Sequence, residues 1–216
     1  MEKLYPKSKV ETQGFMARHY DALLNIATFG SYPSFMKKCL GLIEINPADK
    51  ILDLGAGTGR NAYMMMKYLC PQGQLVGVDI SDDMIHQFKR KCANFPNVRI
   101  IKARIDQPLS LNEKFDKVFI SFVLHGFPQS IREIVIRNSF EALEDGGAFF
   151  ILDYNEGSLR EKPLYARVLF KVIECQYAFD FMEKDWKKIL SNKGFNHFEE
   201  YFFFAKHVRL LKATKI

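Results

Sequence analysis

The stretch Ile51-Leu52-Asp53-Leu54-Gly55-Ala56-Gly57-Thr58-Gly59-Arg60 decides the fold of this 216-residue chain. A short apolar run leads directly into three glycines at alternate positions, and residues 61–69 then follow a helical pattern. Because glycine has no Cβ, the main chain at Gly55 and Gly57 can approach a ligand closely. The stretch therefore predicts a strand, a glycine loop and a helix, with a ligand bound at the carboxyl end of the strand.

Apolar runs alternate with helical segments on the C-terminal side of this loop. The expected strands are 50–54, 74–79, 98–102, 115–121 and 148–153, and the expected helices are 61–69, 82–94 and 130–143. Strands that are apolar almost throughout indicate a parallel sheet covered on both faces. Because crossovers between parallel strands are right-handed, a doubly wound, Rossmann-like α/β topology is expected.

The pattern changes after Tyr154. Helices are expected at about 160–178 and at 184–191, followed by strands at 198–204 and 207–212 with almost no linker. So short a connection can join only antiparallel strands. We therefore expect a seven-stranded, mostly parallel sheet with one antiparallel strand near the edge and helices on both faces.

Length and composition favour a single domain over residues 1–216. Within it we expect an N-terminal helical cap (1–48), a cofactor-binding core (49–154), a helical lid or insertion (155–194) and C-terminal antiparallel strands (195–216). Apolar residues make up 48% of the chain, enough for a substantial core. A helix needs about 20 apolar residues to cross a bilayer, and no apolar run approaches that length. The N-terminus lacks the apolar stretch of a secretory signal, so a cytoplasmic location is expected.

Charge and cysteine content identify no partner or metal. The net charge is +6, but lysines and arginines are spread along the chain, and short runs such as Lys89-Arg90-Lys91 are typical of solvated helix faces. We see no added basic domain, so no nucleic-acid partner is expected. The four cysteines form no C-x-x-C pair, which indicates small buried residues in helices and no metal site; they are Cys39, Cys70, Cys92 and Cys175.

Two acidic residues help to distinguish between possible cofactors. Asp79 ends the second strand, where its carboxylate can accept both hydroxyls of a ribose. The dinucleotide fingerprint needs a glycine at the sixth position from Gly55, and that position is Arg60. Asp53 would lie badly beside a diphosphate but well beside the sulfonium and amino groups of S-adenosylmethionine. The spacing favours this methyl donor, and an NAD-dependent oxidoreductase is the alternative.

These residues resemble the class I S-adenosylmethionine-dependent methyltransferases, and specifically their ubiquinone/menaquinone-biosynthesis-like branch. Residues 53–59 resemble motif I, 76–81 motif II, 115–118 with Leu124-His125 motif IV, and 143–147 the turn before the fifth strand. The segments 16–21 and 27–30 are similar to the N-terminal helices of the quinone enzymes. The resemblance implies S-adenosyl-L-methionine as cofactor.

The resemblance also implies roles for individual residues. The glycines would lie against the methionine part, Asp79 would hold the ribose, and Tyr20 would close over the methionine carboxylate. Ala103-Arg104-Ile105-Asp106 stands where the family often has glycine-aspartate-alanine after the third strand, so Arg104 cannot accept the adenine amino proton and Asp106 is the candidate acceptor. The expected cofactor-binding residues are Tyr20, Asp53, Gly55, Ala56, Gly57, Asp79, Ile80, Met84, Arg104, Ile105, Asp106, Ser121 and Phe122.

The methyl acceptor is expected beside His125, Tyr154 and Tyr165. His125 follows the fourth strand, where it is either a general base or a residue that shapes the pocket without chemistry. The aromatic-rich segment 164–181 is either a lid over a small aromatic or apolar acceptor, such as a quinone precursor, or a core helix with a dimer surface. A lid would permit peripheral contact with an anionic membrane. The chain is a monomer or a homodimer, and a non-catalytic S-adenosylmethionine-binding protein is a further alternative.

Overall fold

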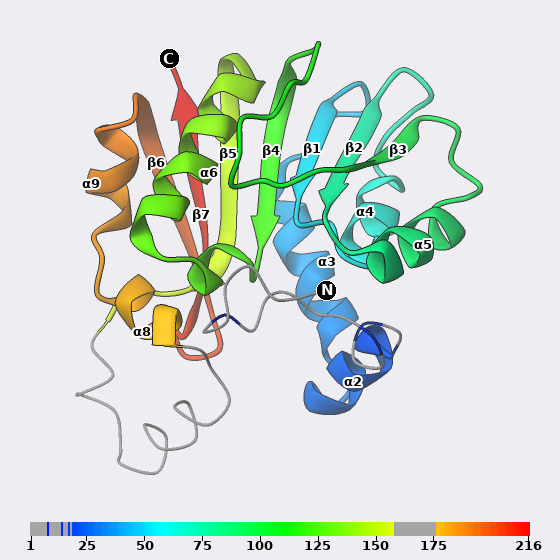
Figure 1. The fold of residues 1–216 in the computed structure, drawn as a ribbon, viewed down its shortest axis with the longest axis horizontal. Helices are drawn as coiled ribbons and strands as arrows, with labels where there is room; N and C mark the ends of the chain where they lie inside the picture. Colours follow the sequence, from blue (N-terminus) through cyan, green and yellow to red (C-terminus); the bar gives the residue numbers. More distant parts are fainter. Residues whose placement is uncertain (1–7, 9–13, 15–16, 18, 158–175) are drawn as a thin grey trace.

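A twisted sheet forms the centre of the computed structural model, which describes residues 8, 14, 17, 19–157 and 176–216 (Figure 1). Within these residues the sheet has seven strands in the order β3-β2-β1-β4-β5-β7-β6. The strands are β1 (Lys50–Leu54), β2 (Gln74–Asp79), β3 (Val98–Lys102), β4 (Phe115–Ser121), β5 (Leu143–Tyr154), β6 (Phe195–Phe203) and β7 (Val208–Lys215).

Strand pairing confirms the predicted fold class. β1 pairs in parallel with β2 and with β4, and the parallel pairing continues to β3 on one side and to β5 on the other. β7 is antiparallel to both β5 and β6, so it is the antiparallel strand next to the edge. From β1, the strands β2 and β3 are added on one side of the sheet and β4 and β5 on the other, so the strand order reverses between β1 and β4. Doubly wound sheets bind ligands at such a switch point.

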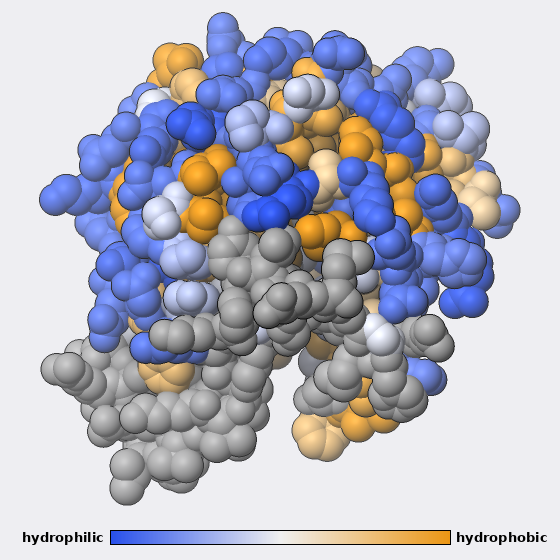
Figure 2. All heavy atoms as spheres, in the orientation of Figure 1, coloured by the Kyte–Doolittle hydropathy of each residue, from blue (hydrophilic) through white to orange (hydrophobic). Residues whose placement is uncertain are grey.

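Helices cover both faces of the sheet. They are α2 (Tyr20–Ala27), α3 (Tyr32–Ile43), α4 (Arg60–Met65), α5 (Asp82–Lys91), α6 (Gln129–Ala142), α8 (Gln176–Met182) and α9 (Trp186–Ser191), with a 3-10 turn, η1 (Leu124–Gly126). Hydrophilic residues cover most of the face in Figure 2 that is not grey, as expected for helices that turn their apolar side inward. No helix among the described residues combines the length and apolarity needed to cross a bilayer.

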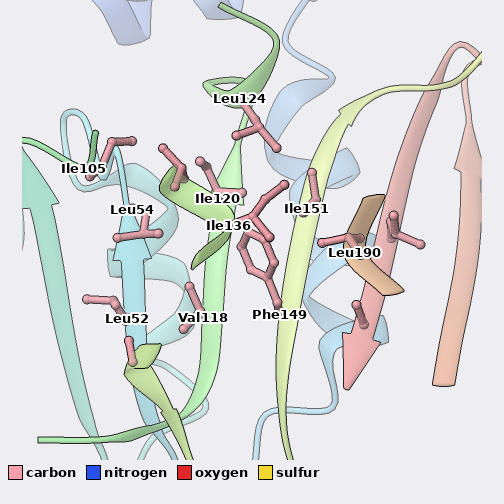
Figure 3. Close-up of a cluster of buried hydrophobic side chains, with 14 of the residues drawn as sticks. Leu52, Leu54, Ile105, Val118, Ile120, Leu124, Ile136, Phe149, Ile151 and Leu190 are labelled. Carbon is pink, nitrogen blue, oxygen red and sulfur yellow. The ribbon is translucent and has the colours of Figure 1, made fainter. Parts of the chain in front are cut away.

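Alternation along the strands divides the core into two clusters. Leu52 and Leu54 of β1 pack with α6, α8 and α9 on one face, whereas Ile51 packs with α3, α4 and α5 on the other. Figure 3 shows the first cluster, in which β1, β4 and β5 side chains meet Ile136 of α6 and Leu190 of α9. Both faces of the central strands are therefore buried, which explains their nearly unbroken apolar runs.

Several predicted boundaries were wrong. The helix after the glycine loop ends at Met65, and the next one ends at Lys91. β5 begins at Leu143 because Leu143 pairs with Phe115 across a register shift in β4. Cys70 follows α4 in a turn and is half-buried, so it is not the buried helical residue that was expected. Most of the helix predicted at 160–178 lies outside the described residues.

Candidate active site

A cavity of about 470 Å³ lies at the carboxyl ends of the parallel strands, a volume typical of small-molecule sites. The carboxyl end of β4 faces the side of the molecule where α2 lies (Figure 1). Most of the predicted site residues line this one cavity: Tyr20, Gly55, Ala56, Gly57, Asp79, Ile80, Met84, Arg104, Ile105, Asp106, Ser121, Phe122, His125 and Tyr154. Asp53 is buried outside the lining, and Tyr165 lies outside the described residues.

The glycine loop is tied to the end of β2 by its own N–H groups. Gly55 and Ala56 both donate to the Val78 carbonyl, at 2.9 and 3.0 Å. Gly59 donates to the Ala56 carbonyl at 3.1 Å, and Gly57 donates to Asp79 Oδ2 at 2.8 Å. Because these donors are used inside the protein, they do not form the cradle of N–H groups that a diphosphate needs.

Asp79 is held in place at the wall of the cavity. Its second oxygen, Oδ1, accepts from the Ser81 N–H at 2.9 Å. Burial raises the pKa of Asp79, and hydrogen bonds from the backbone at Ser81 and Gly57 oppose that rise. The carboxylate is thus fixed at the carboxyl end of β2, in the position predicted for ribose recognition.

Asp53 is a buried acid beneath the glycine loop. It is 2% exposed, and its Oδ2 atom has no hydrogen-bond partner among the described residues. Burial, and secondly the neighbouring Asp79, raise the pKa of Asp53 to about 7. An unpartnered buried acceptor is costly, and a nearby cation reduces that cost. The orphan oxygen therefore fits a cofactor that carries positive charge.

Arg104 and Asp106 form a fork at the end of β3. Arg104 Nε donates to Asp106 Oδ1 at 2.9 Å, and Arg104 Nη2 donates to the other carboxylate oxygen. Asn138 of α6 donates to the Ile105 carbonyl at 2.9 Å and fixes the segment from behind. Arg104, which stands in place of the usual aspartate, therefore orients the carboxylate of Asp106. Adenine recognition by Asp106 stays a prediction.

His125 and Asp153 form a buried dyad at the other end of the cavity. Their Nδ1 and Oδ1 atoms are 2.8 Å apart, and the backbone N–H of His125 donates to Asp153 Oδ2 at 3.1 Å. A carboxylate can only accept hydrogen bonds, so it favours the His125 tautomer that carries its proton on Nδ1. The neutral ring then presents Nε2 as its basic nitrogen. Sequence reasoning did not identify Asp153 as a partner of His125.

Aromatic rings continue from this dyad along the cavity. The Tyr154 ring lies 5.0 Å from the His125 ring and 6.2 Å from the Phe122 ring. Phe35 of α3 is 6.5 Å from Phe122 and 4.9 Å from Phe204 of the β6–β7 turn. Phe122 has a φ of 52°, an unusual value for a bulky residue and one that often marks a functional site. The rings give this end of the cavity an apolar wall.

Arg132 clamps the turn that carries His125. This α6 residue is fully buried, and its Nη2 donates to the His125 carbonyl at 3.2 Å. Its Nη1 donates to Asp180 Oδ2 of α8 at 2.6 Å, and its guanidinium lies 5.2 Å from the Phe181 ring centre. Sequence reasoning missed this residue, because an arginine in an amphipathic helix is usually solvated.

The α2 helix closes the cavity from the N-terminal side. Its Asp21 accepts from Thr58 Oγ1 at 2.8 Å and forms an ion pair with Lys91 of α5. Its Asn25 accepts from Arg60 Nη2 at 2.6 Å. These contacts place Tyr20 at the cavity wall. They join segments far apart in sequence, so no local pattern could have identified Asp21 or Asn25.

A methyltransferase-domain family matches residues 45–194 of the chain. The chain belongs to this family. It is a class I S-adenosylmethionine-dependent methyltransferase, and the relatives that it matches support the menaquinone-biosynthesis-like branch. Two relatives are the demethylmenaquinone methyltransferases of Staphylococcus carnosus strain TM300 and Staphylococcus aureus strain JH9, each 25% identical to it. The match to the first protein covers 84% of this chain and 75% of that protein. The match to the second covers 79% of this chain and 72% of that protein.

Solved structures support the fold. A SAM-dependent methyltransferase from Aquifex aeolicus aligns with a TM-score of 0.63 at 16% identity, covering 84% of this methyltransferase and 89% of that chain. An O-methyltransferase family protein from Burkholderia thailandensis aligns with a TM-score of 0.68 at 15% identity, and the alignment covers 89% of this methyltransferase and 58% of that chain. S-adenosylmethionine is the cofactor, and the fixed Asp79 carboxylate and the orphan Asp53 oxygen fit it.

Proposed function

We propose that this methyltransferase methylates a small aromatic acceptor with an ionisable hydroxyl, of the quinol or phenol class, and that His125 is its general base. The observation that carries the proposal is the buried His125–Asp153 dyad, whose Nδ1 and Oδ1 atoms are 2.8 Å apart and whose His125 lines the same cavity as the glycine loop. Methyl transfer to an atom that is already nucleophilic needs positioning but no base. A buried, oriented histidine therefore favours an acceptor that must lose a proton.

The walls around the dyad support the aromatic part of the proposal. Tyr154, Phe122, Phe35 and Phe204 present ring faces and edges, with which a planar acceptor can stack. The curated relatives act, by their names, on demethylmenaquinone, a naphthoquinone with an apolar side chain. A naphthoquinol fits both the aromatic walls and the need for a base.

Each residue of the dyad has a separate task in this mechanism. S-adenosylmethionine supplies, when bound, a methyl group on a positively charged sulfur. His125 Nε2 takes the hydroxyl proton as the acceptor's oxygen, or the ring carbon conjugated with it, becomes nucleophilic. Asp153 keeps the proton on Nδ1 and stabilises the imidazolium that forms. The aromatic walls exclude water and align the acceptor for in-line attack.

Methyl transfer from labelled S-adenosylmethionine to a demethylated naphthoquinol, and to simple phenols, tests the proposal. We expect His125→Gln to lower kcat at least tenfold, since general base catalysis contributes about 10² to 10⁴ in rate. Asp153→Asn should also lower kcat, and it should shift the pH dependence of kcat, because the amide no longer stabilises the imidazolium. S-adenosylhomocysteine affinity should not change in either variant.

The exposed His86 of α5 provides the control, because it lies away from the cavity lining. His86→Gln should retain wild-type turnover. Near-normal kcat in both His125→Gln and Asp153→Asn would show that the dyad is not the base. Failure of every hydroxylated aromatic acceptor in the wild-type enzyme would contradict the acceptor class.

A further inference from the structure

The buried Arg132 of α6 directs its donors to the two elements that surround His125. Two hydrogen bonds reach the η1 turn, where Nε donates to the Leu124 carbonyl at 3.3 Å and Nη2 donates to the His125 carbonyl at 3.2 Å. Two more reach α8, where Nη2 donates to the Tyr177 carbonyl at 2.5 Å and Nη1 donates to Asp180 Oδ2 at 2.6 Å. A fifth bond stays within α6, so every N–H of the guanidinium is used. One cation therefore joins the turn that carries the histidine to the helix beside it.

The ring of His125 lies next to aromatic rings from two different elements. The Tyr154 ring of β5 is 5.0 Å away, and the Phe181 ring of α8 meets the imidazole edge-on at 6.5 Å. Phe181 is itself fixed, because its ring lies 4.3 Å from the Trp186 ring and its carbonyl accepts from Trp186 Nε1 at 2.9 Å. The orientation of the imidazole thus depends on where η1 and α8 lie, as well as on Asp153.

Stability alone is a poor explanation for this arginine. Arg132 is fully buried, whereas its counter-ion Asp180 is 43% exposed, so the guanidinium carries most of the cost of leaving water. That cost can exceed the attraction between the two charges, and an apolar residue of similar volume would avoid it. An arginine instead supplies planar donors in fixed directions, which can bind carbonyls of two elements at once. The contacts of Arg132 therefore indicate a role in geometry.

We propose that Arg132 is a positioning residue for the His125 base. By joining η1 to α8, it keeps the imidazole in contact with Asp153 and aimed at the acceptor. The inference rests on the proposed function, in which His125 removes a proton. Arg132, Tyr177 and Asp180 lie outside the cavity lining, so Arg132 acts through His125 and does not touch the acceptor.

Steady-state kinetics with the naphthoquinol acceptor test this role. Arg132→Lys keeps the charge but loses the planar set of donors. We expect kcat to fall on the order of tenfold, since a displacement of about 1 Å can cost about a hundredfold in rate. The acceptor KM and the S-adenosylhomocysteine affinity should stay at the wild-type level, which would also show that the variant is folded. In the His125→Gln background the same substitution should lower kcat no further, because the group that it positions is already absent.

Two further variants sharpen the kinetic test. Asp180→Asn removes the charge that holds Nη1 but keeps an acceptor oxygen, so it should lower kcat in the same direction and by less than Arg132→Lys. The exposed Arg137 of the same helix provides the matched control, and Arg137→Lys should leave kcat unchanged.

Nitrogen-15 NMR of the His125 ring tests the positioning without any acceptor. In the wild type and in Arg137→Lys, the contact with Asp153 should keep the proton on Nδ1, whereas Arg132→Lys should populate the other tautomer. A wild-type tautomer in Arg132→Lys, or an equal loss of kcat in the His125→Gln background, would overturn the role of Arg132. Near-normal turnover of His125→Gln would instead overturn the proposed base, and the tautomer would still show whether Arg132 orients the ring.

Discussion

The two ends of the cavity are built in different ways. At the donor end, backbone groups of the glycine loop and of β2 bond one another, and the partners lie within residues 53–84. At the acceptor end, side chains from α3, η1, β5 and the β6–β7 turn meet across the fold. Local backbone geometry therefore sets the glycine loop and Asp79, whereas long-range packing sets the acceptor site. This difference explains why the sequence indicated the cofactor more sharply than the acceptor.

The largest expected effect is on stability at Asp53, beneath the donor end, and it depends on pH. Well below pH 3.8 this carboxyl is protonated in both the folded and the unfolded state. As the pH rises from 3.8 to about 7, the unfolded chain ionises first, so the wild type loses stability. Asp53→Asn avoids this loss. Its free energy of unfolding relative to the wild type should rise by about 4 kcal/mol across that range.

Urea unfolding from pH 4 to pH 8 measures this difference. The exposed Asp82 at the start of α5 provides a control, because Asp82→Asn should show no comparable rise. A stability difference that does not change with pH would show that Asp53 is not held protonated by burial.

Two glycines of the loop should respond differently to the same substitution. Gly59 has a φ of 76°, and a Cβ there would lie 2.7 Å from the Phe88 ring and 3.0 Å from Phe88 Cα. Gly57 has a φ of 54°, and its Cβ would meet nothing closer than 4.0 Å. Gly59→Ala combines backbone strain with overpacking and should cost about 3 kcal/mol of stability, whereas Gly57→Ala should cost about 1 kcal/mol.

Thermal and urea unfolding of the two alanine variants check this ranking. Equal costs would mean that Phe88 moves aside and that the loop geometry tolerates a Cβ at either position. The comparison tests whether close packing, rather than glycine content alone, sets the shape of the donor end.

The smallest expected effect is at the acceptor end. Phe204→Ala removes a half-exposed ring that packs at 4.9 Å from Phe35. It should cost about 1 kcal/mol of stability, the scale of one aromatic pair. The acceptor KM should rise, while S-adenosylhomocysteine affinity stays unchanged.

Phe202→Ala is the matched control, because Phe202 is on the same hairpin and outside the cavity lining. A fall in S-adenosylhomocysteine affinity in Phe204→Ala would show that the two ends are not independent. An unchanged acceptor KM would remove Phe204 from the acceptor wall.

Local sequence patterns determined most of the sheet and the donor end. The predicted bounds of β1, β2, β3 and β4 agree with the structure, because buried parallel strands are short apolar runs bounded by turn residues. The glycine loop and Asp79 were also identified, because a turn with left-handed glycines and an acid at a strand end are local features. The antiparallel β6–β7 pair followed from the shortness of its connection.

The tertiary structure alone decided the acceptor end. His125 and Asp153 are 28 residues apart in sequence, and only the pairing of β4 with β5 brings them together. Arg132 is buried because α8 and the η1 turn cover it, although its helix position suggested solvent. The start of β5 depended in the same way on its partner strand. Side-chain periodicity reports which residues are buried, but which of them meet depends on how distant segments pack.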